Sequence, residues 1–257
     1  MSDTVAVRPL NLMGAALVAS VALVVSLITS VVVASRAYLG RGEQAQRQAR
    51  TLDVTGSARA RITSDLGVWT IRAAGEAKTL EEAYRKLDPS VQALRSFLRE
   101  RGFPDSAVET GAIDTSIHYE RDAKGNETRK VESYSLTRRI RVTLADVERM
   151  ARAAGEVTEL LKNGVQVESG APEYVYTKLA DLKIRMIGEA TGNARLRAER
   201  IAEGTRCRLG AVKDARAGVL QITRPWSTDT SSGGMSDTST IEKDVTSVVQ
   251  LTFVIEP

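Results

Sequence analysis

The chain has 257 residues, of which 42% are hydrophobic, 26% charged and 4% aromatic. This composition is typical of a globular protein and excludes general disorder. The formal net charge of +4 is unevenly distributed: the first 50 residues carry a net +3, and the rest of the chain holds 31 basic and 30 acidic groups. Nucleic-acid-binding proteins have a basic face with interleaved aromatics, so this balanced body predicts no nucleic-acid partner.

An uncharged stretch of 23 residues runs from Leu12 to Ala34. At about 1.5 Å per helical residue, it is long enough to cross a hydrocarbon core of roughly 30 Å. It is apolar all round, unlike the one-sided helix of a soluble domain. The apolar region of a signal peptide has only about 7 to 15 residues, so we interpret the stretch as a retained transmembrane anchor. A signal peptide cleaved after Ala34 is the alternative.

The anchor divides the chain into four predicted parts. These are an N-terminal tail (1–11), the transmembrane anchor (12–34), a polar and basic membrane-proximal connector (35–50) and an α+β domain (51–257). We expect residues 12–34 to contact membrane lipid. One arginine precedes the span and four follow it within the connector, and this count by itself favours a cytoplasmic body.

The domain begins with two predicted strands and a helix. Residues 52–62 alternate apolar and mainly polar side chains, and Val68–Ala74 has a second strand pattern, so we expect a hairpin around the turn between them. Thr79 and Glu82 have the spacing of a capping box, which predicts an amphipathic helix from Thr79 to about Arg101.

The next elements complete a recognisable order. We predict a strand over 108–119, a hairpin tip around Gly125-Asn126, a return strand over 134–144 and a helix from a capping box at Thr143–Asp146 to Asn163-Gly164. A further strand is predicted over 165–176, and Pro172 indicates that it is an edge strand or has a bulge. From residue 68 onwards the order is strand, helix, strand, strand, helix, strand. This order predicts a ferredoxin-like (split βαβ) antiparallel sheet with two helices on one face.

A third helix and a C-terminal β-hairpin are expected to extend this fold. The helix covers about 179–205 and is rich in alanine, so a neighbouring helix could approach it closely; Gly192-Asn193 in its middle has no assigned role. Strands over 212–222 and 245–255 form the hairpin. The segment between them, rich in Ser, Thr, Gly and Asp, is expected to be a flexible tip.

Each residue with potential chemistry has a simpler structural interpretation, so we assign no catalytic, cofactor-binding or metal-binding residues. Glu81 and Glu82 suit the first turn of a helix. His118 is the only histidine, and we interpret it as a solvated strand residue. Asp229 and Asp237 lie in the flexible tip without the spacing of a calcium loop.

The single cysteine, Cys207, excludes an intramolecular disulfide framework. We interpret it as a small buried hydrophobe. Its basic neighbours leave a redox-active thiol open, and intermolecular pairing is a further alternative.

Three segments together resemble a known family. They are LDVTGSARARITSD, LRSFLRERGFPDSAVETGAIDTSIHYE and NARLRAERIAEGTRCRLGAVKDA. They are similar to the SIMPL-domain family of bacterial envelope proteins, which includes periplasmic immunogenic and outer-membrane-protein-28-like proteins. The resemblance runs from about Leu52 to Pro257 and rests on an ordered series of features, since no single motif is specific.

The resemblance implies an α+β domain in the periplasm, and members that assemble into large rings. Some members are associated with oxidative-stress defence or with the outer membrane. No catalytic residues are established that could be carried over. On this basis we expect a single-pass protein of the bacterial inner membrane with its body in the periplasm, against the orientation that the charge count favours.

Three functions follow as hypotheses. The leading one is a non-enzymatic scaffold that self-assembles into a homo-oligomer. The alternative is a binding module that captures a small apolar ligand or an envelope protein in a groove beside the alanine-rich helix. An enzyme is the third, and the absence of G-x-S-x-G, HExxH and a Gly-rich phosphate loop argues against it.

Overall fold

The computed structural model describes residues 31, 35 and 50–256. The predicted tail and anchor, and nearly all of the connector, lie outside these residues, so the anchor stays a prediction. In the part of the chain that the structure describes, no helix is both long and apolar enough to cross a membrane.

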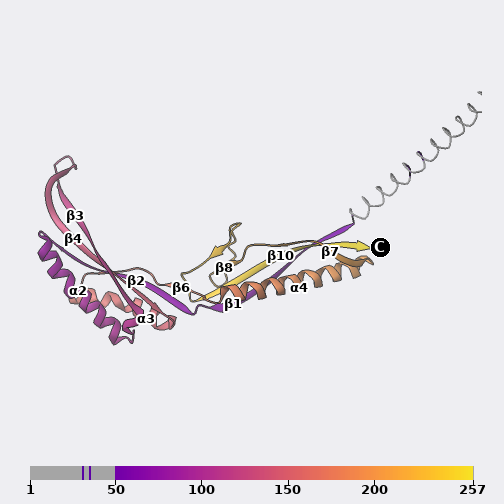
Figure 1. The fold of residues 1–257 in the computed structure, drawn as a ribbon, viewed down its shortest axis with the longest axis horizontal. Coiled ribbons are helices and arrows are strands. Elements are labelled where there is room, and N and C mark those ends of the chain that lie inside the picture. Colours follow the sequence, from indigo (N-terminus) through magenta and orange to yellow (C-terminus); the bar gives the residue numbers. More distant parts are fainter. Residues whose placement is uncertain (1–30, 32–34, 36–49, 257) are drawn as a thin grey trace, which may run out of the picture. The chain divides into compact units, whose positions relative to one another are not determined.

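Residues 50–256 form a mixed α+β structure with two five-stranded sheets and three α-helices (Figure 1). The elements in chain order are β1 (Thr51–Thr63), β2 (Leu66–Ala77), α2 (Leu80–Glu100), the 3-10 helix η1 (Asp105–Ala107), β3 (Val108–Arg121), β4 (Glu127–Leu144), α3 (Val147–Glu156), the 3-10 helix η2 (Val157–Asn163), β5 (Val167–Ser169), β6 (Glu173–Val175), α4 (Leu179–Thr205), β7 (Arg208–Ala217), β8 (Gln221–Thr223), β9 (Met235–Ser236) and β10 (Glu242–Glu256).

The chain divides into two compact units. Within residues 50–256, the first contains residues 50–54, Arg197–Ala215 and residues 251–256, and the second contains Thr55–Leu196 and Arg216–Gln250. Within the first unit the start of β1 lies beside the end of β10, because the Ile255 N–H donates to the Arg50 carbonyl at 3.1 Å. All the sites discussed below lie in the second unit.

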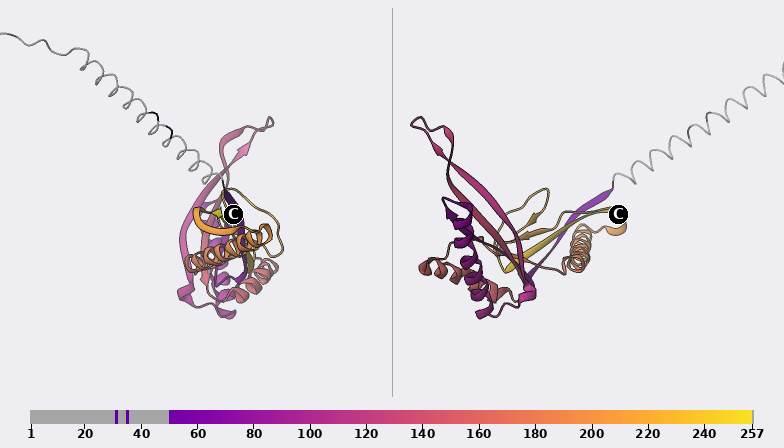
Figure 2. Two further views of the ribbon diagram at one scale, coloured as in Figure 1. Left: turned by 90° about the vertical axis from the view of Figure 1, so that its right-hand side faces the viewer. Right: turned by 60° about the vertical axis from the view of Figure 1, so that its left-hand side comes forward.

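One sheet of the second unit has the strand order β3-β4-β2-β5, with β6 also pairing with β2. In this sheet β2 pairs antiparallel with β4, β5 and β6, and β3 pairs antiparallel with β4. Helices α2 and α3 lie along this sheet (Figures 1 and 2). The core between them holds fully buried side chains from both layers, among them Trp69, Ile71, Leu87, Leu94 and Ile140.

Helix α2 confirms its predicted start and end. The Thr79 side chain accepts a hydrogen bond from the Glu82 N–H at 3.3 Å, and Gly102 follows with a φ of 77°. The helix crosses β2 at Gly75, where an added Cβ would lie 2.5 Å from the Leu87 nitrogen and 2.9 Å from the Leu87 Cα. A glycine is therefore required for the helix to approach the strand this closely.

The predicted hairpin between β1 and β2 is wrong. Within residues 50–256 the two strands belong to different sheets, and β1 lies at the edge of the order β1-β10-β8-β9, with β7 also pairing with β10. The chain changes sheets at Ser64-Asp65: the Ser64 N–H donates to Ile241 and the Asp65 N–H to Val175. The turn between the two strands is therefore tied to distant segments.

Helix α4 confirms its predicted bounds but not its predicted neighbour. Gly56 of β1 lies against it so closely that a Cβ there would overlap the Ala190 carbonyl and the Ala194 backbone nitrogen. A strand occupies the alanine face where we expected a helix. The unassigned Asn193 also has a role, because its side-chain oxygen accepts from the Ser57 N–H at 3.2 Å.

Several boundaries differ from the predictions. Helix α3 is capped by Asp146, which accepts from the Arg149 N–H at 2.9 Å, because Thr143 still belongs to β4. The strand expected over 165–176 is split into β5 and β6 around Pro172, which has no N–H for the ladder. The C-terminal strands β8 and β10 pair antiparallel, and the segment between them contains β9, which pairs with β8.

The close contact at Gly75 gives a first prediction. We expect Gly75→Ala to destabilise the protein by about 1–3 kcal/mol, because overpacking forces backbone atoms apart. The matched control is Gly155→Ala in α3, where a Cβ would meet nothing within 4 Å. That change should stabilise by about 0.5–1 kcal/mol. Urea unfolding followed by circular dichroism measures both, and equal effects of the two changes would contradict the packing account.

Candidate functional site

The residues singled out from the sequence do not converge on one site. His118 is exposed on β3, and Glu81 lies in the exposed first turn of α2, 3.8 Å from Arg85. Cys207 is a half-buried free thiol directly after α4. No group of three or more potential metal ligands occurs among the described residues. Two other kinds of feature in the second unit carry potential function: exposed apolar surfaces, and a polar cluster beside an exposed aromatic side chain.

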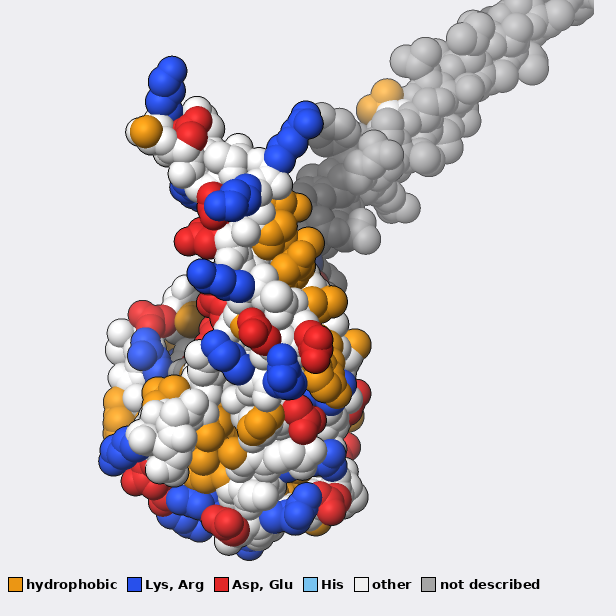
Figure 3. Space-filling view, turned by 90° about the vertical axis from the view of Figure 1, so that its left-hand side faces the viewer, with side chains coloured by type: hydrophobic (Ala, Val, Ile, Leu, Met, Phe, Trp, Pro, Cys, Tyr) orange, Lys and Arg blue, Asp and Glu red, His pale blue; other side chains and the backbone are white. Residues whose placement is uncertain are grey.

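The first feature is the outer half of the β3–β4 hairpin, which extends beyond the helices in Figures 1 and 2. No residue of β3 is buried, and residues 114–119 are all exposed. Ile117 pairs with Tyr134 and Tyr119 pairs with Val131, which brings apolar side chains together across the two strands. Figure 3 shows hydrophobic side chains along this hairpin below its charged tip. We call residues 113–135 the ribbon.

The ribbon also has an open backbone edge. Strand β3 ends the order β3-β4-β2-β5, so among the described residues β4 is its only strand neighbour. An edge strand presents unpaired N–H and C=O groups, which are a template for pairing with another chain. An isolated two-stranded ribbon is also only marginally stable by itself. The ribbon thus has the properties of a surface that another strand covers.

The outer face of α4 is a second surface of the same kind. Ile184 is 73% exposed, and Gly188 and Gly192 follow it at intervals of four residues on the side opposite the buried alanines. A Cβ at either glycine would meet nothing within 4 Å. Each glycine costs a helix about 1 kcal/mol relative to alanine. Nothing within residues 50–256 explains this cost.

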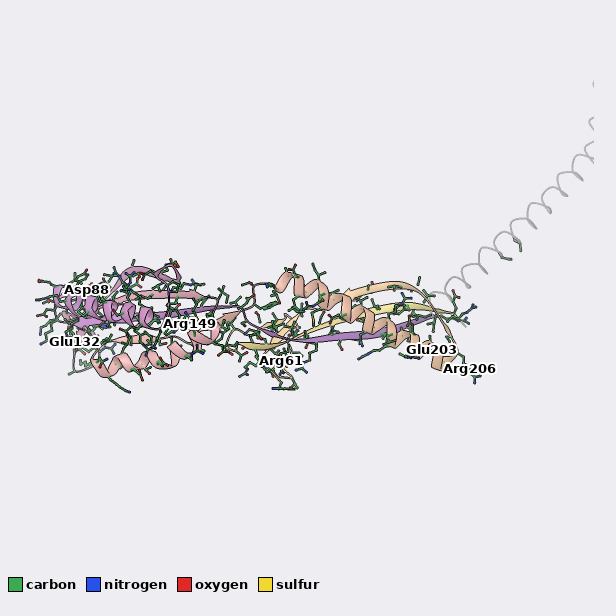
Figure 4. The ribbon with its side chains drawn as sticks, turned by 90° about the horizontal axis from the view of Figure 1, so that it is seen from below. Arg61, Asp88, Glu132, Arg149, Glu203 and Arg206 are labelled. Atoms are coloured by element: carbon green, nitrogen blue, oxygen red, sulfur yellow. The ribbon has the colours of Figure 1, made fainter. Side chains whose placement is uncertain are left out.

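The second feature is a polar cluster around Asp244 of β10, whose side chain is 3% exposed. Its carboxylate accepts hydrogen bonds from Arg59 at 2.7 Å and from Arg61 at 2.9 and 3.1 Å. The backbone N–H of Trp226 donates to it at 3.0 Å. Arg61 comes from β1, and Figure 4 labels it. Hydrogen bonds from Arg61 and from the Trp226 N–H hold the pKa of Asp244 well below its usual range.

Trp226 occupies an unusual turn in this cluster. Pro225 precedes it, its own φ is 65°, and the Ser227 N–H donates back to the Arg224 carbonyl at 3.1 Å. These are the features of a type II turn, in which glycine is the usual residue at the position of Trp226. A side chain in this region costs of order 1–3 kcal/mol. A glycine would make the same hydrogen bond to Asp244 without strain, so that bond does not explain the tryptophan.

The Trp226 side chain is also exposed, at 79%. The Arg61 guanidinium lies 4.2 Å from the centre of its ring and covers one face. A cation–π contact at an exposed site is worth about 0.5–1 kcal/mol, which is less than the upper range of the backbone strain. Because the side chain is 79% exposed, the other face of the indole is open to solvent. The contact with Arg61 thus stabilises the fold only a little.

A second polar cluster shapes the loop beside Trp226. Lys243 is 2% exposed and lies 3.3 Å from the Asp237 carboxylate, and it also donates to the Thr240 carbonyl. Burial would raise the pKa of Asp237, but hydrogen bonds from Ser239, Thr240 and Lys243 lower it well below its usual range. Burial lowers the pKa of Lys243 against the pull of Asp237. Asp237 is therefore bonded within the loop, in the segment where we expected a flexible tip.

A hollow of about 260 Å³ opens next to this turn. Its lining exposes polar and apolar atoms in similar amounts, and every lining residue except Met235 has a polar side chain: Thr223, Arg224, Ser227, Asp229, Met235, Ser236, Asp237 and Ser239. Arg224 and Ser227 flank the Pro225-Trp226 pair in the sequence, so the hollow borders the turn that presents the indole. We call Trp226 together with this hollow the tryptophan site.

A comparison with protein families identifies the class of the chain. The SIMPL family model, described as "Protein of unknown function (DUF541)", matches residues 52–253. The chain therefore belongs to the SIMPL family, and the resemblance noted in the sequence is confirmed. A search of curated proteins finds no match.

The sequence alone did not point to the tryptophan site. The features that could have indicated it are a tryptophan directly after a proline, in the sequence R-P-W-S, and acidic residues in the Ser/Thr-rich loop that follows. The partners Arg59 and Arg61 lie about 180 residues away in the chain, at separations of 185 and 183 from Asp244. Only the pairing of β1 with β10 brings them together.

The lowered pKa of Asp244 gives a prediction about acid stability. A carboxylate with a lowered native pKa contributes stability above its ordinary pKa of about 3.9, and this stability is lost as the pH falls toward the native value. We expect Asp244→Asn to lose about 1–3 kcal/mol at pH 7 and to show a weaker further loss on acidification. Chemical unfolding at pH 7 and near pH 2, where the carboxylate of the unfolded chain is protonated, measures both.

The control for this experiment is Asp88→Asn on the exposed face of α2, labelled in Figure 4. Surface substitutions usually change stability by less than about 0.5 kcal/mol. If Asp244→Asn behaved like Asp88→Asn at both pH values, the carboxylate would not hold the loop.

Proposed function

We propose that this chain is a non-enzymatic scaffold protein of the bacterial cell envelope that self-assembles into a large homo-oligomer, a ring or cage. Residues 12–34 anchor it in the inner membrane as a single span, with the body in the periplasm. The role is structural and linked to envelope or oxidative stress. The anchor, the location and the stress link rest on the sequence and on the family resemblance.

The observation that carries self-assembly is the ribbon. It combines the outer part of the open edge of β3, residues 113–121, with exposed apolar side chains, Ile117 at 44% and Tyr119 at 37%. Soluble proteins usually protect long edges with charge, proline or short strands, because open edges pair with other chains. A second copy of the chain, adding a strand to β3, would satisfy the unpaired backbone groups and cover the apolar pairs.

The outer face of α4 supports the same proposal. Exposed glycines four residues apart allow the backbone of another helix to approach closely, and Ile184 supplies an apolar side chain beside them. We propose that this face contacts a helix of a neighbouring copy. Two separate surfaces per protomer are what a closed ring or cage requires.

We also propose the ferredoxin-like arrangement for β2-α2-β3-β4-α3-β5. The strand order β3-β4-β2-β5 with antiparallel neighbours supports it. This arrangement leaves β3 at one edge of its sheet, and it would place the same open edge on every copy of an assembly.

The alternative binding module has less support at the place where we expected it. The alanines that would line a groove beside α4 are buried, and Gly56 fills the space over two of them. A hollow of about 600 Å³ between α2 and residues 163–166 is lined by polar and apolar groups in similar amounts, including the charged side chains of Arg85 and Lys86. Ligand pockets for apolar molecules are predominantly hydrophobic, so this mixed lining gives the alternative only weak support.

Light scattering of the full chain in mild detergent tests the proposal directly. We expect one discrete particle of many subunits. Ile117→Lys/Tyr119→Lys should convert most of this mass to protomers, because charge on the ribbon opposes strand addition. The matched control is Ser116→Lys/His118→Lys, which adds the same charges to the opposite side of β3 and should disturb assembly less. A wild-type chain that is monomeric would falsify the scaffold.

The glycine face of α4 gives a prediction of opposite signs. Gly188→Gln/Gly192→Gln should raise the stability of the protomer by about 1 kcal/mol, because glutamine favours helix more than glycine does. The same change should weaken assembly, because the longer side chains keep a second helix away. Thermal unfolding and light scattering on one sample measure the two effects. If assembly were unchanged while stability rose, the face would not be an interface.

A further inference from the structure

The tryptophan site has the features of a ligand-binding site, and the fold does not explain why a tryptophan occupies it. Trp226 occupies a glycine position of a type II turn with a φ of 65°, and its indole is exposed. Bulky residues in this backbone region are outliers that concentrate at functional positions. Self-assembly through the ribbon and α4 makes no use of this turn.

The surroundings decide which ligand fits. Between residues 220 and 247, Trp226 is the one large hydrophobic side chain that is exposed. Protein interfaces bury an apolar core of several side chains, which an isolated indole in a polar loop does not supply. The neighbouring hollow instead offers hydroxyl, carboxylate and guanidinium groups within a small volume.

The local charge excludes ligands dominated by one sign. Basic and acidic side chains are nearly balanced around the turn: Arg59, Arg61, Arg224 and Lys243 against Asp229, Asp237 and Asp244. Asp229 and Asp237 line the hollow and would repel a phosphate there. A neutral ligand that both donates and accepts hydrogen bonds suits this lining best.

We propose that the tryptophan site binds a neutral saccharide. A sugar ring has an apolar C–H face and polar hydroxyl edges. The C–H face of one ring would stack on the open face of Trp226, while Arg61 supports the indole from behind at 4.2 Å. A neighbouring ring would lie in the hollow of about 260 Å³ and exchange hydrogen bonds with Arg224, Ser227 and Asp229. The Asp244 carboxylate, which accepts from the Trp226 backbone N–H, holds the turn in place before the ligand arrives.

The two tryptophans of the chain allow a direct measurement. Trp69 is fully buried and donates its indole N–H to Ser169 and Gly170, so only Trp226 should be accessible to iodide. The full chain, in a detergent without a sugar headgroup, is titrated with cellotetraose, chitotetraose and maltotetraose. We expect at least one to shift the emission to the blue and to protect it from iodide, with saturation below about 10 mM.

Calorimetry on variants separates binding from folding. Trp226→Gly should keep or raise the melting temperature, because it removes the backbone strain. It should weaken saccharide binding at least about tenfold, whereas Trp226→Tyr keeps an aromatic face and should weaken it less. Asp229→Asn tests the hollow and should reduce affinity without changing the fluorescence of the free protein.

Two outcomes would overturn the proposal. One is the absence of saturable binding by all three tetrasaccharides, and the other is equal binding by wild type and Trp226→Gly. If Trp226→Gly instead dissociated the oligomer in parallel light scattering without any saccharide effect, the indole would be a contact between copies. Because binding and particle mass are measured separately, failure of this proposal is distinguishable from failure of self-assembly.

Discussion

Close approach of a helix backbone to a strand backbone is the constraint on which this structure depends. It occurs at Gly75 beneath α2 and at Gly56 beneath α4, and in both places a Cβ would overlap main-chain atoms of the helix. Main-chain atoms cannot move aside as a flexible side chain can, so these positions set how the helices lie on their strands. Small residues around each contact, such as Ala83, Ala190 and Ala194, allow the same approach from the helix side.

Hydrogen-bonded charges organise the parts that close packing does not reach. Asp244 joins β1, β10 and the turn at Trp226, and Asp237 with Lys243 closes the loop between β8 and β10. Buried charges are tolerated only where partners replace the lost water. These clusters therefore give an otherwise polar loop a defined shape. The loop also presents the exposed side chain of Trp226, whose backbone strain is not offset by its contacts within the fold.

What the protein leaves uncovered is as informative as its core. The ribbon, the glycine face of α4 and the indole of Trp226 each expose groups that folding would be expected to protect. The first two are extended and apolar, which suits another copy of the chain. The third is isolated among hydroxyls and carboxylates, which suits a small polar ligand. Membership of the SIMPL family gives the chain a class, and these surfaces suggest how it acts within that class.

The sequence by itself determined the local elements and the family. Helix α2 with its Thr79 cap, helix α4 and the long strands β3, β4 and β10 follow from periodicity and capping residues, since both depend on neighbours in the chain. Only the tertiary structure decided that β1 and β2 separate into two sheets, that Gly56 meets the alanine face of α4, and that Arg61 and Asp244 support Trp226. The contacts of Gly56 with α4 and of Arg61 with Asp244 join residues more than 100 positions apart. Hydrophobic periodicity specifies which face of an element is buried, not which partner buries it.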